Sequence, residues 1–127
     1  MAHANPPAKP VILVVEDEPL LRLNAIDIIQ QAGYDAVEAD NADEACRILE
    51  TRTDIRIVFS DIDMPGSLDG LKLAAVVRRR WPPIELILTS GHIRPAEADL
   101  PLRGRFFPKP YQAEQLLSAI HGLLRSA

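Results

Sequence analysis

The chain contains little that would indicate an exported, membrane-bound or nucleic-acid-binding protein. A single cysteine, Cys46, excludes an intramolecular disulfide, and nothing in the composition implies an oxidising compartment. No apolar run approaches the roughly 18 residues that a membrane-spanning helix needs, and residues 1–10 lack the apolar core of a signal peptide. The net charge of -4 gives no electrostatic reason to expect a nucleic-acid partner. We therefore expect a cytoplasmic protein.

The 127 residues also lack internal repeats, low-complexity tracts and any sign of a second domain. This length supports one domain with a single substantial core. Residues 1–10 are predicted to be a disordered tail, and residues 11–127 the folded domain. The initiating Met1 and the stop at Ala127, soon after the last predicted helix, favour a free protein over a piece of a larger one.

Five apolar runs alternate with segments of helical periodicity along the domain. The predicted strands cover residues 11–15, 35–39, 57–60, 84–88 and 104–107. The predicted helices cover residues 20–32, 42–50, 70–80 and 112–125, with Asn41 as a cap of the second and Asp69 or Ser67 of the third. Pro95 and Pro101 leave room only for a short or irregular helix between Arg94 and Arg105. The alternation predicts an α/β fold, a doubly wound five-stranded parallel sheet with helices on both faces.

Polar side chains follow or end four of the five predicted strands. In chain order they are Glu16, Asp17, Asp61, Asp63, Thr89 and Lys109. Right-handed crossovers bring these strand ends to one edge of the sheet. Clustered carboxylates repel one another, and a hard divalent cation such as Mg²⁺ relieves that repulsion. The set suits phosphoryl transfer, because a carboxylate can act as nucleophile while fixed charges stabilise the phosphoryl oxygens.

Several of these residues also have a purely structural interpretation. Asp63 can bond its own backbone in the turn before Pro65, and Glu16 can interact with the N-terminus of the first helix. Thr89 suits a strand by its shape alone. Lys109 is one of three lysines in an arginine-rich chain, which argues against a merely solvated role.

Four segments, in this order and spacing, resemble the receiver domain of bacterial two-component response regulators, the CheY-like family. The resemblance covers the whole chain except the tail. The segments are Val-Val-Glu-Asp-Glu at 14–18, Ser-Asp-Ile-Asp-Met-Pro-Gly at 60–66 with Asp69-Gly70, Leu-Thr-Ser at 88–90, and Phe-Phe-Pro-Lys-Pro-Tyr at 106–111. The resemblance implies a flavodoxin-like strand order 2-1-3-4-5. It also implies a phosphorelay regulator whose only reactions are its own phosphorylation and dephosphorylation.

The resemblance assigns the carboxylates. Asp61 would be the phosphoacceptor, supplied by a histidine kinase or a histidine phosphotransfer protein. Asp17 and Asp61 would ligate Mg²⁺ directly, with Mn²⁺ as a possible substitute, and Glu16 would act mainly through water. Asp63 would offer its backbone carbonyl, leaving its own carboxylate free to tune how water reaches the phosphate.

The resemblance likewise assigns the remaining residues. Lys109 would bind the phosphoryl oxygens, and Thr89 would be the switch hydroxyl, with the small Ser90 beside it leaving room for phosphate. Phe106 occupies the switch aromatic position, although an aromatic residue there is equally a core residue. The resulting switch would change the surface of the last two strands and the last helix, in a monomer or a phosphorylation-dependent dimer.

Three features depart from the common family pattern. The loop of residues 66–70 is one residue longer, Phe106 replaces a frequent tyrosine, and the proline-rich residues 94–105 are expected to shorten or unwind the fourth helix. That helix belongs to the usual partner surface of the family, so its interaction mode does not transfer directly.

Alternatives from other classes remain open at this point. Asp61-Ile62-Asp63 resembles the paired-aspartate motif of haloacid-dehalogenase-type phosphatases, although that motif normally lies on an early strand of a larger core. A flavodoxin lacks support, because no Ser/Thr-rich phosphate loop follows the first strand. The chain could also be a phosphate shuttle, or a receiver cut from a hybrid histidine kinase.

Overall fold

The computed structural model describes residues 9–64, 69–92 and 104–126 of the chain. Its centre is a sheet of five parallel strands in the order β2-β1-β3-β4-β5. The strands are β1 Val11–Val15, β2 Asp35–Ala39, β3 Ile55–Asp61, β4 Glu85–Ser90 and β5 Gly104–Pro108. The helices of the described residues are α1 Pro19–Gln31, α2 Ala42–Thr51, α3 Gly70–Arg80 and α4 Ala113–Ser126. The predicted doubly wound parallel sheet and its strand order are confirmed.

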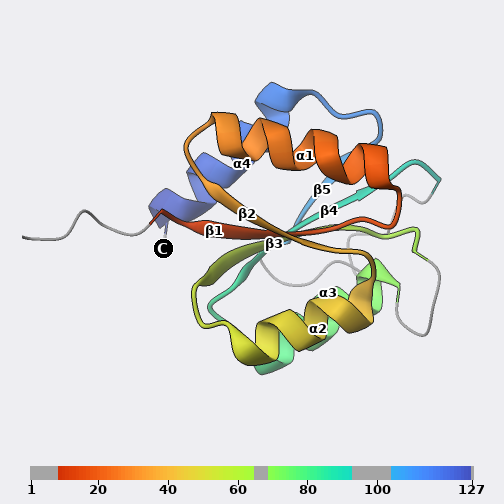
Figure 1. Cartoon of the computed structure of the whole chain (residues 1–127), viewed down its shortest axis with the longest axis vertical. Helices are drawn as coiled ribbons and strands as arrows, with labels where there is room; N and C mark the ends of the chain where they lie inside the picture. The colour runs from red at the N-terminus through yellow and green to blue at the C-terminus, as the bar shows by residue number, and fades with distance from the viewer. Residues whose placement is uncertain (1–8, 65–68, 93–103, 127) are drawn as a thin grey trace, which may run out of the picture.

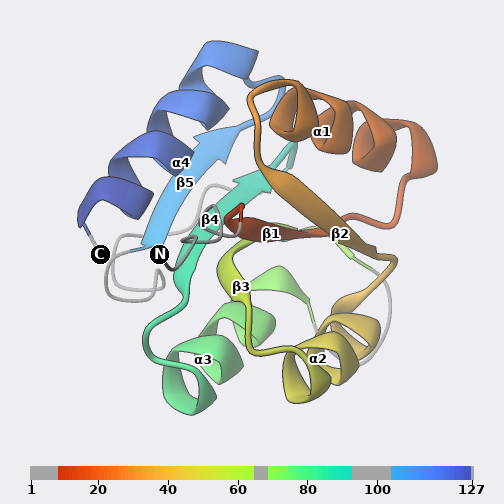
Figure 2. The ribbon, with the colours of Figure 1, turned by 60° about the vertical axis from the view of Figure 1, so that its left-hand side comes forward.

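The sheet is covered on both faces (Figure 1). Helices α1 and α4 lie over one face and α2 and α3 over the other, an arrangement that Figure 2 shows from a second side. Successive residues of β1 alternate between the two cores: Ile12 and Val14 pack in the cluster under α1 and α4, whereas Leu13 and Val15 pack in the cluster under α2 and α3. A strand buried on both faces must be apolar throughout, which explains the uninterrupted run of residues 11–15.

The helix ends follow local sequence signals. Asn41 caps α2 by accepting a hydrogen bond from the backbone N of Glu44 at 2.8 Å, and Asp69 caps α3 by accepting one from the backbone N of Lys72 at 2.9 Å. Both predicted caps are confirmed. Gly33 follows α1 with φ of 95°, a conformation that glycine adopts without strain.

One boundary difference affects the site. The prediction ended the fourth strand at Leu88, whereas β4 continues to Ser90. Thr89 pairs in register with Asp61 of β3 and with Phe107 of β5, and Ser90 pairs with Pro108. Pairing with neighbouring strands, rather than local propensity, extends β4: Thr89 is held between β3 and β5, and Ser90 is held by β5.

Two predictions fall outside the described ranges: the disordered tail, apart from its last two residues, and the short or irregular helix between Arg94 and Arg105. Among the described residues, no helix is long and apolar enough to cross a membrane.

Candidate functional site

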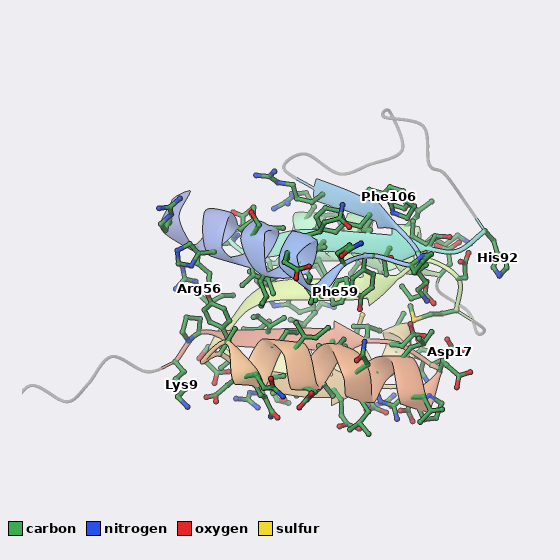
Figure 3. All side chains as sticks on the ribbon, turned by 90° about the horizontal axis from the view of Figure 1, so that it is seen from above. Lys9, Asp17, Arg56, Phe59, His92 and Phe106 are labelled. Atoms are coloured by element: carbon green, nitrogen blue, oxygen red, sulfur yellow. The ribbon has the colours of Figure 1, made fainter. Side chains whose placement is uncertain are left out.

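The carboxyl ends of the strands meet at one edge of the sheet, the right-hand side of Figure 3, where Asp17 is labelled. Asp61 is the last residue of β3 and lies opposite Thr89 of β4. Glu16 directly follows β1, and its backbone N donates to the carbonyl of Ala39 at 3.1 Å. Lys109 directly follows β5, and its backbone N donates to the carbonyl of Ser90 at 2.8 Å. Backbone hydrogen bonds therefore hold both flanking residues in place.

Lys109 joins two buried carboxylates. Its Nζ lies 2.9 Å from Glu16 Oε1 and 3.1 Å from Asp61 Oδ2, and the two acidic residues are 6% and 4% exposed. Burial acts against the charged lysine, but the hydrogen bond to Glu16 and the charge of Asp61 outweigh it and raise the pKa of Lys109. The lysine is therefore a fixed cation directed at the predicted acceptor.

The acidic residues form a compact oxygen cluster. One carboxylate oxygen from each of Glu16, Asp17 and Asp61 lies within 4.8 Å of the others. Burial raises the pKa of Asp61, although Lys109 counteracts part of this rise. Partial desolvation raises the pKa of Asp17, and the adjacent Glu16 raises it further. Excess negative charge on hard oxygen donors is the environment that a divalent cation such as Mg²⁺ relieves, so these three residues fit such an ion.

Glu16 serves the helix as well as the cluster. Its second carboxylate oxygen, Oε2, accepts a hydrogen bond from the backbone N of Glu18, the residue immediately before α1, at 3.1 Å. Its backbone carbonyl accepts a hydrogen bond from Arg22 Nη1 at 2.8 Å. The structural interpretation of Glu16 thus holds together with its place at the site, because each carboxylate oxygen has a different partner.

Thr89 presents a buried hydroxyl beside Asp61. Its side chain is almost fully buried, and its Oγ1 has no hydrogen-bond partner among the described residues. Thr89 lines a small cavity together with Glu16, Asp61 and Tyr111. A buried hydroxyl without a partner is unfavourable, so this atom is suited to a group that enters the site.

Asp63 differs from the expectation. Its backbone N donates to Asp61 Oδ1 at 3.2 Å, which helps to orient the acceptor. Its Oδ2 accepts hydrogen bonds from Ser90 Oγ at 2.6 Å and from the backbone N of Gly91 at 3.3 Å. The expectation that the Asp63 carboxylate is free is therefore wrong, because β4 extends far enough to bring Ser90 next to this loop. The metal-binding role of the Asp63 carbonyl stays a prediction.

Phe106 lies apart from the cluster. It is half-buried and packs with the core under α2 and α3, whereas Phe59 and Tyr111, which line the Thr89 cavity, belong to the core under α1 and α4. Figure 3 shows Phe106 on β5, at the outer strand of the sheet. Its function as a switch residue stays a prediction.

Gly70 packs against the end of β3 beside Asp61, a contact that the sequence did not predict. A Cβ on Gly70 would lie 2.6 Å from the Cα of Ile62 and even closer to the carbonyl oxygen of Asp61. The backbone N of Gly70 donates to the carbonyl of Ile62 at 3.1 Å, so α3 begins in direct contact with the end of β3. A glycine immediately after the helix cap Asp69 was the available signal, but only the tertiary contact explains it.

The comparisons with known proteins agree with this geometry. The family described as response regulator receiver domain matches residues 12–121 of the chain. The sensor kinase CckA of Brucella abortus (strain 2308) is 35% identical over 117 residues, 89% of this chain. A response regulator receiver protein from Pseudomonas putida has a TM-score of 0.82 at 31% identity, over 91% of this chain and 98% of that one.

A further similar structure was solved as a complex with Mg²⁺ and BeF. The response regulator protein TrrA from Thermotoga maritima, in complex with Mg²⁺ and BeF, has a TM-score of 0.77 at 26% identity, over 89% of this chain and 97% of that one. The chain spans only 12% of the length of CckA, and 23% to 24% of two further curated relatives. The similarity therefore concerns one domain of those longer proteins.

Proposed function

The chain belongs to the response regulator receiver domain family, and from that premise we propose that it is a phosphorylation switch whose acceptor is Asp61. The observation that supports this most directly is the position of Lys109 Nζ, 3.1 Å from Asp61 Oδ2, in a site with an acidic cluster and an unpartnered Thr89 hydroxyl. The phosphodonor would be a histidine kinase or a histidine phosphotransfer protein. The output would be a changed protein-interaction surface, not a released product.

Asp61, Lys109 and Thr89 each have a separate role in phosphoryl transfer. An oxygen of Asp61 attacks the phosphorus, and the bond from phosphorus to the donor nitrogen breaks, leaving its electron pair on the imidazole. Lys109 stabilises the negative charge on the phosphoryl oxygens without having to move, because Glu16 already holds it. The Thr89 hydroxyl donates to a phosphoryl oxygen and gains a partner, which it does not have among the described residues. Phe106 would then repack on β5.

Mg²⁺ fits the oxygen cluster of Glu16, Asp17 and Asp61. When bound, it would neutralise part of the charge on both the carboxylates and the phosphoryl group. Asp17 is the exposed member of the set and would hold the ion on the solvent side, while the buried Asp61 faces Lys109.

The surface beside the site is suited to docking a protein donor. Leu20 and Leu23 on α1 are 75% and 62% exposed, and Leu21 lines an open cavity together with Glu16 and Lys109. An exposed apolar patch next to a reactive group is typical of an interaction site. We expect Leu23→Ser to slow phosphotransfer from a phosphotransfer protein but not from acetyl phosphate.

The phosphatase alternative is not favoured. The family match covers most of the chain, and the carboxylate of Asp63, which such an enzyme would use as its acid, already accepts two hydrogen bonds. Sustained hydrolysis of a phosphomonoester by the protein would support the phosphatase alternative.

The test is a direct comparison of the wild type with Asp61→Asn. Both proteins are treated with beryllofluoride and Mg²⁺ and followed by NMR, and with acetyl phosphate and followed by mass spectrometry. The wild type should shift the resonances of residues 60–63 and 88–91 and gain one phosphoryl group, while the variant does neither. Asp54→Asn, at the opposite edge of the sheet, is the matched control and should behave as wild type. Two unresponsive proteins would reject the proposal.

A further inference from the structure

Four contacts form a closed ring that begins and ends at the two oxygens of the Asp61 carboxylate. The backbone N of Asp63 donates to Asp61 Oδ1 at 3.2 Å, and Asp63 Oδ2 accepts from Ser90 Oγ at 2.6 Å. The carbonyl of Ser90 accepts from the backbone N of Lys109 at 2.8 Å, and Lys109 Nζ lies 3.1 Å from Asp61 Oδ2. The ring connects three strand ends, and Ser90 is the member that joins the Asp63 side to the Lys109 side.

The hydroxyl of Ser90 is held in one orientation. Ser90 is 2% exposed, and its Oγ accepts a hydrogen bond from the backbone N of His92 at 3.1 Å. A hydroxyl has one proton to donate, and at 2.6 Å that proton faces Asp63 Oδ2. Hydrogen bonds to an ionised carboxylate are short and strong, and the backbone N of Gly91 adds a second donor to the same oxygen. The carboxylate of Asp63 is therefore firmly engaged at the end of β4.

We propose that Ser90 is a positioning residue that keeps the Asp63 carboxylate engaged at the end of β4 and thereby lengthens the lifetime of the Asp61 phosphate. The inference rests on the proposed function. In hydrolysis, the oxygen of a water molecule attacks phosphorus, the bond to the Asp61 oxygen breaks with its electron pair going to Asp61, and a water proton passes to solvent. A released carboxylate two residues from the acceptor would accept a hydrogen bond from that water and orient it for attack. The hydrogen bond from Ser90 to Oδ2 holds that carboxylate at the end of β4 and so keeps it from orienting the water.

The test measures phosphate lifetime in a double-mutant cycle. Wild type, Ser90→Ala, Asp63→Ala and the double variant are phosphorylated with acetyl phosphate, freed of the donor, and followed by mass spectrometry. Ser90→Ala should lose its phosphate at least about tenfold faster than wild type, because an oriented water attacks more readily than a freely moving one. The double variant should hydrolyse at the rate of Asp63→Ala alone, because the acceleration requires the released carboxylate.

The outcomes separate the inference from the proposed function. A wild type that takes up no phosphate at Asp61 would reject the function, and this inference with it. A phosphorylated wild type with an unchanged lifetime in Ser90→Ala, or with the same acceleration in the Asp63→Ala background, would overturn the role of Ser90 alone. Urea unfolding of each variant shows whether a change in lifetime accompanies a loss of fold, and a short lifetime in a folded Ser90→Ala supports the proposal.

Discussion

Charged side chains are arranged differently at the edge of the sheet where the strands begin and at the edge where they end. The edge where β3 and β4 begin lies on the left of Figure 3, where Arg56 is labelled, and it carries two exposed ion pairs. Arg52 binds Asp54 through two hydrogen bonds of 2.9 and 2.6 Å, and Arg80 Nη1 lies 3.2 Å from Glu50 Oε1. At the edge where the strands end, one oxygen from each of three carboxylates lies within 4.8 Å of the others. Lys109 contacts two of these carboxylates.

The pKa shifts report the same difference. The hydrogen bond from Arg52 lowers the pKa of Asp54, so its charged form stabilises the fold. Burial raises the pKa of Asp61, so its charged form destabilises the fold while no ligand is present. The charged pairs at the first edge satisfy each other, whereas the excess of carboxylates at the second fits an incoming cation and, under the proposed function, an incoming phosphoryl group. Four changes test this contrast, beginning with the largest expected effect.

Among changes that keep the acceptor Asp61, replacing Lys109 with Met should slow phosphorylation most. The variant retains an apolar stem of similar length but loses the cation 3.1 Å from Asp61 Oδ2. We expect phosphorylation by acetyl phosphate to slow on the order of 100-fold, as when one preorganised electrostatic contact to a developing charge is removed. The rate is measured by mass spectrometry at fixed Mg²⁺. Lys72→Met, on the exposed side of α3, is the control, and equal slowing in both variants would contradict the role of Lys109.

Replacing Gly70 with Ala should have the largest effect on folding. The added Cβ would meet the backbone of Asp61 and Ile62, neither of which can yield as a flexible side chain would. We expect a loss of about 2 kcal/mol in unfolding free energy, as for other overpacked sites, together with slower phosphorylation because the end of β3 is displaced. Gly122→Ala is the matched control on α4, since no heavy atom lies within 4 Å of its added Cβ. Equal urea midpoints for Gly70→Ala and wild type would show that α3 can move away.

Replacing Asp61 with Asn should stabilise the protein in the absence of Mg²⁺. The pKa of Asp61 in the folded state lies above the ordinary value of 3.8, so at pH 7 the ionised side chain weakens the fold. The variant should therefore have the higher urea midpoint at pH 7. The difference should shrink as pH falls through the raised pKa, and vanish below 3.8, where Asp61 is protonated in both states.

Added Mg²⁺ should raise the urea midpoint of the wild type more than that of Asp61→Asn, because binding to the folded state alone stabilises it. If the two proteins have equal midpoints at pH 7 and equal responses to Mg²⁺, the excess negative charge at this edge has no energetic consequence.

Replacing Asp54 with Asn should have the smallest effect. The pKa of Asp54 is lowered by Arg52, so its contribution to stability is present above 3.8 and is lost as pH falls through the lowered pKa. Because the pair is exposed, the urea midpoint at pH 7 should fall only slightly, and phosphorylation should be unchanged. A marked loss of phosphorylation would show that the two edges of the sheet are coupled.

Much of the fold could be predicted from local patterns. The apolar run of residues 11–15, the caps Asn41 and Asp69, and Gly33 each act within one turn or one strand, so neighbouring residues suffice to reveal them. The end of β4 could not be predicted in this way, because Thr89 is held by pairing with β3 and β5 and Ser90 by pairing with β5. The contact of Gly70 with the end of β3 was hidden for the same reason.

The sequence by itself determined which groups could react. Carboxylates after two apolar runs, a threonine at the end of a third and a lysine after a fourth indicate phosphoryl transfer at one sheet edge, since parallel strands end together. Only the tertiary structure decided which of those groups bond to one another. Lys109 bonds both Glu16 and Asp61, and the carboxylate of Asp63 bonds Ser90. Residues 27 or more positions apart in the chain make these hydrogen bonds, and their distances depend on how strands distant in sequence pair with one another.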